Sequence, residues 1–205
     1  MSGSGPFQDK PSIRVEGVTL ARGLRVLTRE LSFGARPGEL VEVRGGNGTG
    51  KTTLLRAIAG YLKPKSGAIA FEGAEEPALH LHHVGHLNGL KGATSVRTHL
   101  RYWAGLFDVE PRDEDALAQL GLSQQAELPA RVLSQGQARR LALSRLVIAP
   151  RPIWLLDEPA AALDAQGRDM LARLIEAHRA KGGLIIAAVH EALGPTPSQT
   201  ITVGA

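Results

Sequence analysis

A glycine-rich loop that joins an apolar strand to a helix constrains the fold of this chain more than any other feature. Residues 39–44, ELVEVR, have the pattern of a strand and run directly into GGNGTGKTT at residues 45–53. Apolar residues at helical spacing follow, and the helix is expected to end at Gly60. A strand, a loop and a helix in this order predict an α/β protein.

The loop fits the pattern G-x-x-x-x-G-K-[ST], with Lys51 and Thr52 at its end. Its glycines allow backbone N–H groups to approach phosphate oxygens, and the following helix points its positive end at the same charge. Lys51 is expected to neutralise the β- and γ-phosphates of a nucleotide, and the Thr52 hydroxyl to bind Mg²⁺. The alternative, a glycine-rich turn with an incidental lysine, is disfavoured by the strand and helix on either side. The residues predicted to contact the nucleotide are Gly45, Asn47, Gly48, Gly50, Lys51, Thr52 and Thr53.

Two acidic residues end a second apolar strand, IWLL at residues 153–156. A carboxylate at the end of a buried strand costs several kcal/mol if it is unpaired, so a cation is expected beside it. Asp157 is predicted to hold Mg²⁺ through water. Glu158 is predicted to position and deprotonate the attacking water, an effect worth roughly 10²–10⁴-fold in rate. The alternative is that the two acids merely end a strand.

The segment LSQGQ at residues 133–137 is a third marker, and its serine lies 23 residues before Asp157. It opens an amphipathic helix expected over residues 136–148. Ser134 can cap that helix, or its hydroxyl and the neighbouring N–H groups can bind a γ-phosphate. The residues with this second possible role are Ser134, Gly136 and Gln137. The arginines expected on the polar side of the helix are Arg139, Arg140 and Arg145.

Together these motifs resemble the ATP-binding subunits of ABC transporters, over about residues 13–193. The resemblance implies a P-loop NTPase of ABC ATPase type: an α/β fold with a mixed central sheet, an antiparallel β subdomain and a small α-helical subdomain. It also implies an ATPase that uses ATP and Mg²⁺ and acts on integral membrane subunits, with no direct contact to nucleic acid. In this family the LSQGQ-type segment contacts the nucleotide of a second copy, so a head-to-tail homodimer is expected on ATP binding.

The resemblance assigns roles to two further segments. His190 follows the apolar run at residues 184–189, in the strand expected beside that of Asp157, and would point at the γ-phosphate. Otherwise a histidine that ends a strand is structural. Leu163 and Asp164 match the loop that crosses the dimer seam, although Asp164 can also cap the next helix. The predicted catalytic residues are Lys51, Glu158 and His190.

Three positions depart from the common family pattern. Gln135 replaces the first of two glycines, His86 stands where a glutamine is usual, and Arg22 stands where an aromatic residue normally stacks on adenine. A guanidinium can also stack on a base, so Arg22 is kept as a nucleotide contact. His86 is predicted to lie beside Mg²⁺ in the loop between the nucleotide and the membrane subunit. A haem ligand, a metal cluster with the histidines within residues 80–83, and plain packing are the alternatives.

These departures resemble one branch of the family, the ATP-binding subunits of the cytochrome c maturation system, or haem exporter ATPases. The matching segments are GH at residues 85–86, GLK at 89–91, YW at 102–103 and PIWLLDEP at 152–159. Ala161 and Val189 replace hydroxyl residues often found in this branch. The branch implies that ATP hydrolysis drives haem export or the release of a haem-loaded chaperone. Two alternatives stay open: the ATPase of another ABC transporter for a lipid, ion or small solute, and a soluble ABC ATPase acting in cofactor assembly or on nucleic acid.

The length of 205 residues suits one domain, and the absence of cysteine excludes disulfides and thiolate metal sites. Residues 1–11 are rich in Gly, Ser and Pro and are expected to be disordered. Residues 12–205 are expected to form a single ABC ATP-binding domain with a helical insert at about residues 90–150. Apolar runs of about 18 residues and a signal-peptide pattern are lacking, so we expect a peripheral protein on the cytoplasmic face of the inner membrane.

The remaining elements follow from local patterns. Residues 13–20 and 24–33 are expected to form antiparallel strands, and residues 66–71 a further strand. Helices are expected from a cap at Thr94 through Phe107, at Glu114–Leu120 with a stop at Gly121, and at Ala165–Lys181 between two apolar strands. The continuous apolar runs of those two strands suit burial on both faces of a parallel sheet.

Overall fold

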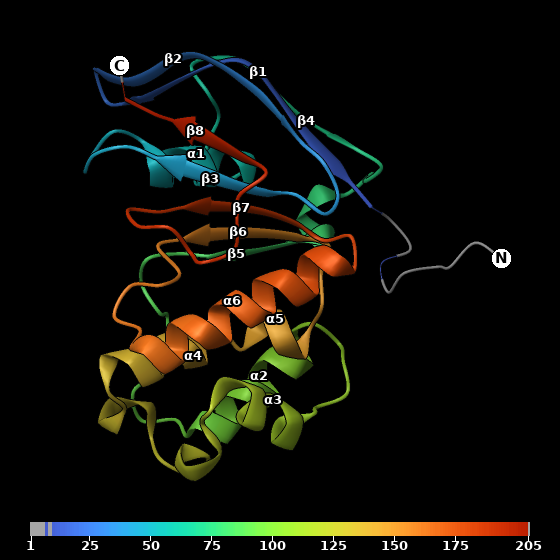
Figure 1. The fold of residues 1–205 in the computed structure, drawn as a ribbon, viewed down its shortest axis with the longest axis vertical. Coiled ribbons are helices and arrows are strands. Elements are labelled where there is room, and N and C mark those ends of the chain that lie inside the picture. The colour runs from blue at the N-terminus through green and yellow to red at the C-terminus, as the bar shows by residue number, and fades with distance from the viewer. Residues whose placement is uncertain (1–6, 8–9, 205) are drawn as a thin grey trace, which may run out of the picture.

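The central feature of the fold is a five-stranded sheet in which the pairings are parallel (Figure 1). The computed structural model describes residue 7 and residues 10–204. The strands lie in the order β5, β6, β7, β3, β8. Their bounds are Leu40–Arg44 for β3, Leu81–Val84 for β5, Ile153–Asp157 for β6, Leu184–Ala188 for β7 and Gln199–Thr202 for β8. Because parallel strands end at the same edge, the loops after β3, β5, β6 and β7 gather there.

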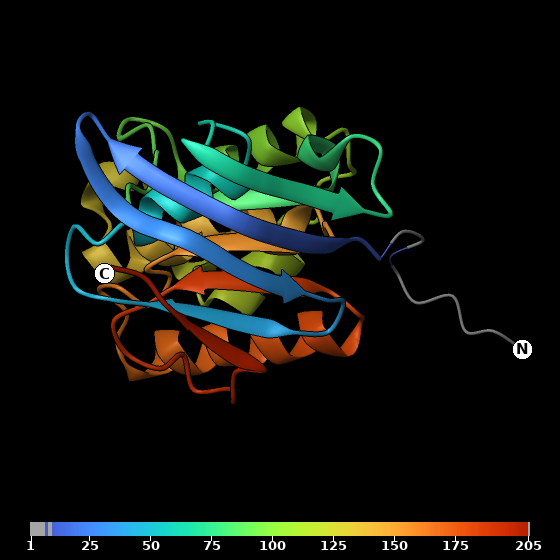
Figure 2. The same cartoon turned by 90° about the horizontal axis from the view of Figure 1, so that it is seen from above.

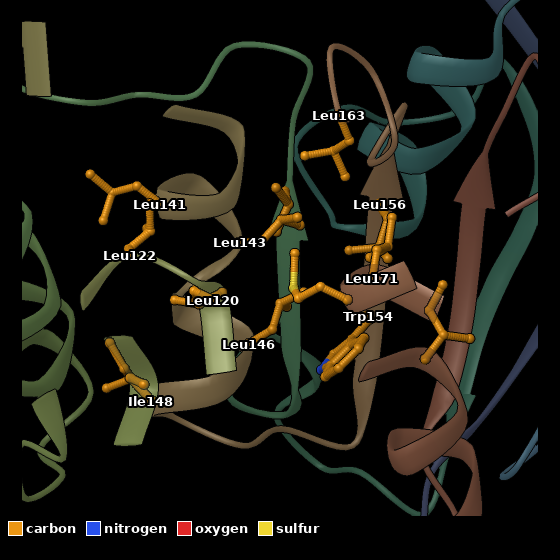
Figure 3. Close-up of a cluster of buried hydrophobic side chains, with 14 of the residues drawn as sticks. Leu120, Leu122, Leu141, Leu143, Leu146, Ile148, Trp154, Leu156, Leu163 and Leu171 are labelled. Carbon is orange, nitrogen blue, oxygen red and sulfur yellow. The ribbon is translucent and has the colours of Figure 1, made fainter. Parts of the chain in front are cut away.

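Strands β6 and β7 are the apolar runs, and every residue in both is buried. Side chains alternate between the two faces of the sheet: Trp154 and Leu156 join the core on the helical side, whereas Ile153 and Leu155 join the opposite core. Figure 3 shows the helical-side core, where side chains of β6 meet those of the surrounding helices. Burial on both faces explains why the two segments have no polar alternation. Helix α6 (Ala165–Ala180) connects them in the predicted βαβ unit.

A separate antiparallel sheet covers the other face of the central sheet (Figure 2). It consists of β1 (Ser12–Arg22), β2 (Arg25–Ala35) and β4 (Ser66–Glu72), in the order β2, β1, β4. Helix α1 (Lys51–Ile58) contributes Leu54, Leu55 and Ile58 to the core on this side. The antiparallel subdomain is therefore confirmed, and the antiparallel pairings lie in this second sheet rather than in the central one.

The helical subdomain occupies the lower half of Figure 1. Its helices are α2 (Val96–Leu106), α3 (Asp113–Leu120), α4 (Gln135–Leu143) and α5 (Arg145–Ile148). Short 3₁₀ turns lie at Pro77–His80, Ser123–Gln125 and Ala130–Val132. Gly121 ends α3 in the left-handed conformation, as predicted. The cap of α2 was predicted at Thr94, which is wrong by one residue: the Ser95 side chain accepts the Thr98 N–H, while the Thr94 carbonyl accepts the Ala130 N–H.

Two expectations about the helix after LSQGQ are wrong. The helix is not continuous over residues 136–148, because α4 ends at Leu143 and α5 begins at Arg145, with Ser144 between them. Arg139 and Arg140 are not on a polar face either, since they are only 3% and 7% exposed. Arg139 donates to the main-chain carbonyl of Asp157 at the end of β6, and Arg140 pairs with Asp164 at 3.1 Å. Helical periodicity shows which residues share a face of the helix. It does not show whether that face is exposed, because the segments that cover it come from elsewhere in the chain.

The predicted disorder of residues 1–11 falls largely outside the described residues, which lack residues 1–6 and 8–9. Phe7 is described, and its ring meets the edge of the His178 ring with the centroids 5.4 Å apart. In the part of the chain that the structure describes, helices that combine the length and apolar character needed to span a membrane are absent.

Candidate functional site

The glycine-rich loop between β3 and α1 needs glycine at two of its positions. Gly45 has φ 152° and Gly50 has φ 111°, values that side-chain-bearing residues rarely adopt. A Cβ on Gly45 would collide with the carbonyl oxygen of Val203, and one on Gly50 would lie 3.1 Å from the Leu27 Cβ. Backbone conformation and the close approach of neighbouring strands therefore both exclude a side chain here.

Lys51 begins α1 and folds back over this loop. Its Nζ donates to the carbonyl oxygens of Gly45 and Gly46, at 2.7 Å and 3.0 Å. The residue is 6% exposed, so its ammonium is largely shielded from water. A shielded cation interacts more strongly with an anion than an exposed one, and this one lies at the positive end of a helix.

Thr52 and Asp157 come together from α1 and β6. The Thr52 hydroxyl donates to Asp157 Oδ2 at 2.9 Å, and Asp157 is 2% exposed. A hydroxyl and a carboxylate in contact supply two adjacent hard oxygen ligands, the type that Mg²⁺ prefers. These two side chains therefore fit a Mg²⁺ site completed by phosphate oxygens and water.

Glu158 follows β6 with its backbone in the left-handed region, at φ 49°. Its N–H donates to the Ala188 carbonyl at 2.9 Å, which ties it to the end of β7. Its carboxylate lies between two imidazoles: Oε1 is 2.9 Å from His190 Nε2, and Oε2 is 4.0 Å from His86 Nδ1. The structure thus brings together three residues that are widely separated in the sequence.

A cavity of about 680 Å³ opens beside the phosphate loop. This volume is within the roughly 300–1,000 Å³ typical of small-molecule sites. The predicted residues that line it are Arg22, Asn47, Gly48, Gly50, Lys51, Thr52, Thr53, His86, Asp157 and Glu158. Sequence reasoning did not assign the other lining residues to the nucleotide site, and Leu27, Arg56 and His83 are among them. Arg56 could have been predicted from the sequence, because it lies four residues after Thr52 on the same face of α1.

His190 lines a smaller cavity, of about 200 Å³, on the other side of the Glu158 carboxylate. Its strand, β7, lies beside β6 as predicted. The Arg168 guanidinium also lines this cavity and pairs with Glu191 at 2.9 Å. Arg168 further contacts the Leu163 carbonyl at 3.4 Å, so the segment after His190 is connected to the loop before α6.

The LSQGQ segment forms a capping box at the start of α4. The Ser134 hydroxyl accepts the Gln137 N–H at 3.2 Å, and Gln137 Oε1 accepts the Ser134 N–H at 2.9 Å. A Cβ on Gly136 would lie 2.9 Å from the Ala162 carbonyl oxygen. The predicted capping role of Ser134 is therefore confirmed. Ser134, Gly136 and Gln137 do not line the cavity beside the phosphate loop of the same chain.

Asp164 caps α6, as predicted. Its Oδ1 accepts the Gly167 N–H at 2.8 Å, and its carboxylate also pairs with Arg140. Leu163, which precedes it, is buried in the core on the helical side. The predicted role of both residues at a dimer seam stays a prediction.

Arg139 is the main site feature that sequence reasoning missed. Its guanidinium donates to the carbonyl oxygens of Asp157, Glu158 and Pro159, at 2.7, 2.9 and 3.3 Å. Burial lowers the pKa of this guanidinium, while the negative charges of Asp157 and Glu158 act to raise it. An arginine does not lose its proton in a protein, so these carbonyls face a buried positive charge.

The histidines at residues 80–83 do not assemble a metal site. His82 is 2% exposed, its Nε2 lies 2.6 Å from the Ala149 carbonyl, and burial lowers its pKa to about 3. Burial also lowers the pKa of His83, which the nearby Asp157 acts to raise. Among the described residues, His, Asp and Glu side chains do not gather in groups of three or more that could hold a metal ion. The cluster alternative therefore has no structural support.

Comparison with known proteins agrees with this geometry. A family model described as ABC transporter matches residues 28–161. A protein from Hyphomonas neptunium named cytochrome c biogenesis ATP-binding export protein CcmA is 44% identical over 193 residues, which cover 94% of this chain and 97% of that protein. This chain belongs to the CcmA family of ABC transporter ATP-binding proteins. Another CcmA, from Rhodopseudomonas palustris, is 47% identical over 92% of this chain and 96% of its own length.

Solved structures give the same result for the fold. A putative ABC transporter ATP-binding protein from Pyrococcus furiosus superposes with a TM-score of 0.82 at 24% identity, covering 94% of this chain and 97% of the other. The predicted ABC ATPase fold is therefore confirmed. As a CcmA-family ABC protein the chain is an ATPase. Family membership also implies membrane partner subunits and dimerisation.

Proposed function

We propose that this chain is the ATP-hydrolysing subunit of a membrane complex of cytochrome c biogenesis, and that it couples ATP binding and hydrolysis to haem export or to the release of a haem-loaded chaperone. One observation carries the choice of site: Lys51, Asp157 and Glu158 come from different elements to line a single cavity. The cytochrome c role is supported by relatives of that name at 44% and 47% identity. It is also supported by His86 and Gln135, which depart from the common ABC pattern.

The nucleotide is held by the loop of residues 45–53. Lys51 exchanges its loop carbonyls for the β- and γ-phosphates, and the loop N–H groups bind the same oxygens. Arg22 lines the cavity as well, and its guanidinium stacks on the base. Thr52 and Asp157 hold Mg²⁺, which when bound neutralises charge on the phosphate oxygens. His86 borders this site through its contact with Glu158.

Glu158 is the general base of this proposal. Its carboxylate accepts a proton from the attacking water, and the hydrogen bond between Oε1 and His190 fixes its direction. His190 also donates towards the γ-phosphate as charge develops there. Lys51 stabilises the same charge from the other side.

The second surface of each site comes from a second copy of the chain. Ser134, Gly136 and Gln137 of one subunit contact the γ-phosphate held by the other in a head-to-tail homodimer, with Leu163 and Asp164 at the seam. Hydrolysis separates the subunits, and this opening drives the integral membrane subunits. Residues 12–205 act as one ATP-binding domain with a helical insert at about residues 90–150, placed peripherally on the cytoplasmic face of the inner membrane. Direct contact with nucleic acid is not part of the proposal.

Replacing the general base tests the hydrolytic part. Glu158→Gln keeps the shape of the side chain but cannot take a proton. We expect it to bind ATP, to hydrolyse it roughly 10²–10⁴-fold more slowly and to accumulate as a dimer. The matched control is Glu191→Gln, which removes a nearby exposed carboxylate paired with Arg168. Normal turnover by Glu158→Gln, measured as phosphate release, would remove Glu158 from this role.

Identification of the membrane partner tests the cytochrome c part. The tagged full-length chain is purified from detergent-solubilised membranes, and co-purifying proteins are identified by mass spectrometry. Membrane subunits of cytochrome c maturation are the expected result, whereas subunits of a lipid, ion or solute transporter would favour the first alternative. Salt-sensitive binding of nucleic acid would favour the soluble ABC ATPase instead. Titration with haem is expected to give no Soret shift, because His86 is not proposed as a haem ligand.

A further inference from the structure

The Arg139 guanidinium connects three segments that meet beneath the nucleotide cavity. Its main-chain contacts at Asp157, Glu158 and Pro159 have been described. It also donates from Nη1 to the Gly85 carbonyl at 2.9 Å and to Asn88 Oδ1 at 3.2 Å, both in the loop after β5. The arginine itself is part of α4 in the helical subdomain. The end of β6, the loop that carries His86 and the helix that starts at LSQGQ are therefore joined through one side chain.

The contact with Glu158 has a specific physical consequence. A residue other than glycine at φ 49° is in a conformation that costs of order 1–3 kcal/mol and persists only when its surroundings hold it. Three hydrogen bonds hold this one. The Ala188 carbonyl accepts its N–H, and its own carbonyl accepts both the Ala161 N–H at 3.1 Å and Arg139 Nη2 at 2.9 Å. Arg139 thus stabilises the backbone turn that places the Glu158 carboxylate beside His190.

The position of Arg139 on α4 supplies the other half of the argument. It lies five residues after Ser134, just over one helical turn from the start of the LSQGQ surface. A displacement of that surface moves Arg139 with it, because both belong to one rigid helix. The movement reaches the Glu158 carbonyl directly, through a partly buried charged hydrogen bond.

From this geometry we infer that Arg139 is a positioning residue that couples contact at the LSQGQ surface to the orientation of the Glu158 carboxylate in the same subunit. The inference rests on the proposed ATPase site and adds a path between its two surfaces. When the LSQGQ surface of one subunit contacts the nucleotide of the other, α4 is held in one position. Arg139, which belongs to α4, then holds Glu158 in the orientation that hydrolysis needs. Through Gly85 and Asn88 the same guanidinium connects the loop of His86, so a membrane partner that contacts that loop acts on the same turn.

Arg139→Lys isolates this role. Lysine keeps the positive charge and most of the length, but its single nitrogen cannot reach carbonyls on two segments at once as the planar guanidinium does. We expect kcat for ATP hydrolysis to fall about tenfold or more, with KM and the affinity for ATP within about twofold of the unmodified chain. The melting temperature is expected to change little, because the charge and packing volume are kept.

Arg151→Lys is the matched control. Arg151 also donates to two main-chain carbonyls, those of Ala78 and Leu81, and it stacks on Phe107, but it lies at the opposite end of β5 and β6. The Arg151→Lys substitution should leave kcat for ATP hydrolysis unchanged. The inference is overturned if Arg139→Lys turns over ATP at the normal rate, if Arg151→Lys loses as much kcat, or if ATP affinity and melting temperature fall together with kcat.

Asn88→Ala keeps the test decisive if Arg139→Lys does not fold. It removes one acceptor of the guanidinium from a partly exposed loop residue, and we expect a fall in kcat of about two- to threefold at unchanged ATP affinity. An unchanged kcat would overturn the coupling. The unmodified chain is assayed in parallel: its failure to hydrolyse ATP would contradict the proposed function, whereas normal turnover in the variants contradicts only the role of Arg139.

Discussion

The phosphate loop and the LSQGQ segment differ in where their polar groups find partners. Around the phosphate loop, side chains bond across elements: Lys51 to the loop, Thr52 to Asp157, and Glu158 to His190. These residues meet at two adjoining cavities that share Glu158. In LSQGQ, among the residues that the structure describes, the side chains of Ser134 and Gln137 each accept the other residue's backbone N–H, within one helical turn.

The two regions therefore have different requirements for binding a nucleotide. The first region is assembled by the folding of one chain, because β3, β6 and β7 end at one edge of the sheet. The second presents a helix N-terminus whose side chains are satisfied locally, so that it stays ordered before any partner arrives. A site built from both needs two copies of the chain, and variants of the two regions should therefore fail in different ways.

Lys51→Ala should have the largest effect, because it removes the ammonium that binds phosphate at the phosphate loop. Losing a shielded ammonium that faces phosphate costs about 3 kcal/mol, or roughly a hundredfold in ATP affinity. Equilibrium binding of a fluorescent ATP analogue measures it. The exposed Lys65 serves as the control, and Lys65→Ala should bind normally. Retained affinity in Lys51→Ala would place the phosphates elsewhere.

Ser134→Ala should impair the second region without affecting the first. We expect ATP to bind the isolated chain normally while turnover falls about ten- to a hundredfold, because a hydrogen bond to the γ-phosphate is lost. Loss of the helix cap costs a further ~1 kcal/mol of stability. Ser95→Ala is the matched control, since it removes a cap of the same kind from α2. Ser95→Ala should lower stability by a similar amount and leave turnover unchanged. If the two variants lost turnover equally, the role of Ser134 would be limited to capping α4.

Mixing the two defective chains should give the smallest but sharpest signal. In a head-to-tail dimer of Lys51→Ala with Ser134→Ala, one site carries both defects and the other carries neither. With half of the dimers mixed and one of two sites intact in each, about a quarter of the normal rate should return. Phosphate release by the mixture, compared with each variant alone, measures this. An inactive mixture would contradict the shared site.

Much of the phosphate-loop region could be read from the sequence, because its signals are local. Gly45 and Gly50 are required by the path of the backbone, and Lys51 and Thr52 follow at fixed spacing. The continuous apolar runs indicated that β6 and β7 are buried on both faces, and they are. The cap at Ser134 and the stop at Gly121 were equally local, and both are confirmed.

Other features could not be read, because they depend on segments far apart in the chain. Arg139 occupies a position that helical periodicity assigned to a polar face, yet it is buried against the end of β6 and the loop after β5. Leu27 and His83 carry no motif and reach the cavity only through the packing of two sheets. The start of α2 also lies beside a distant segment, since the Thr94 carbonyl accepts the Ala130 N–H while Ser95 caps the helix.

Sequence patterns alone were enough to identify the residues that can bind phosphate and metal and the order of the strands and helices, since glycine spacing, apolar periodicity and capping residues act over a few neighbouring positions. Folding of the whole chain was needed to place the Glu158 carboxylate between His190 and His86, and to connect its backbone to the LSQGQ helix through a buried guanidinium. The reason is physical: a buried charge is stable only where several acceptors converge on it, and convergence from different segments is a property of packing.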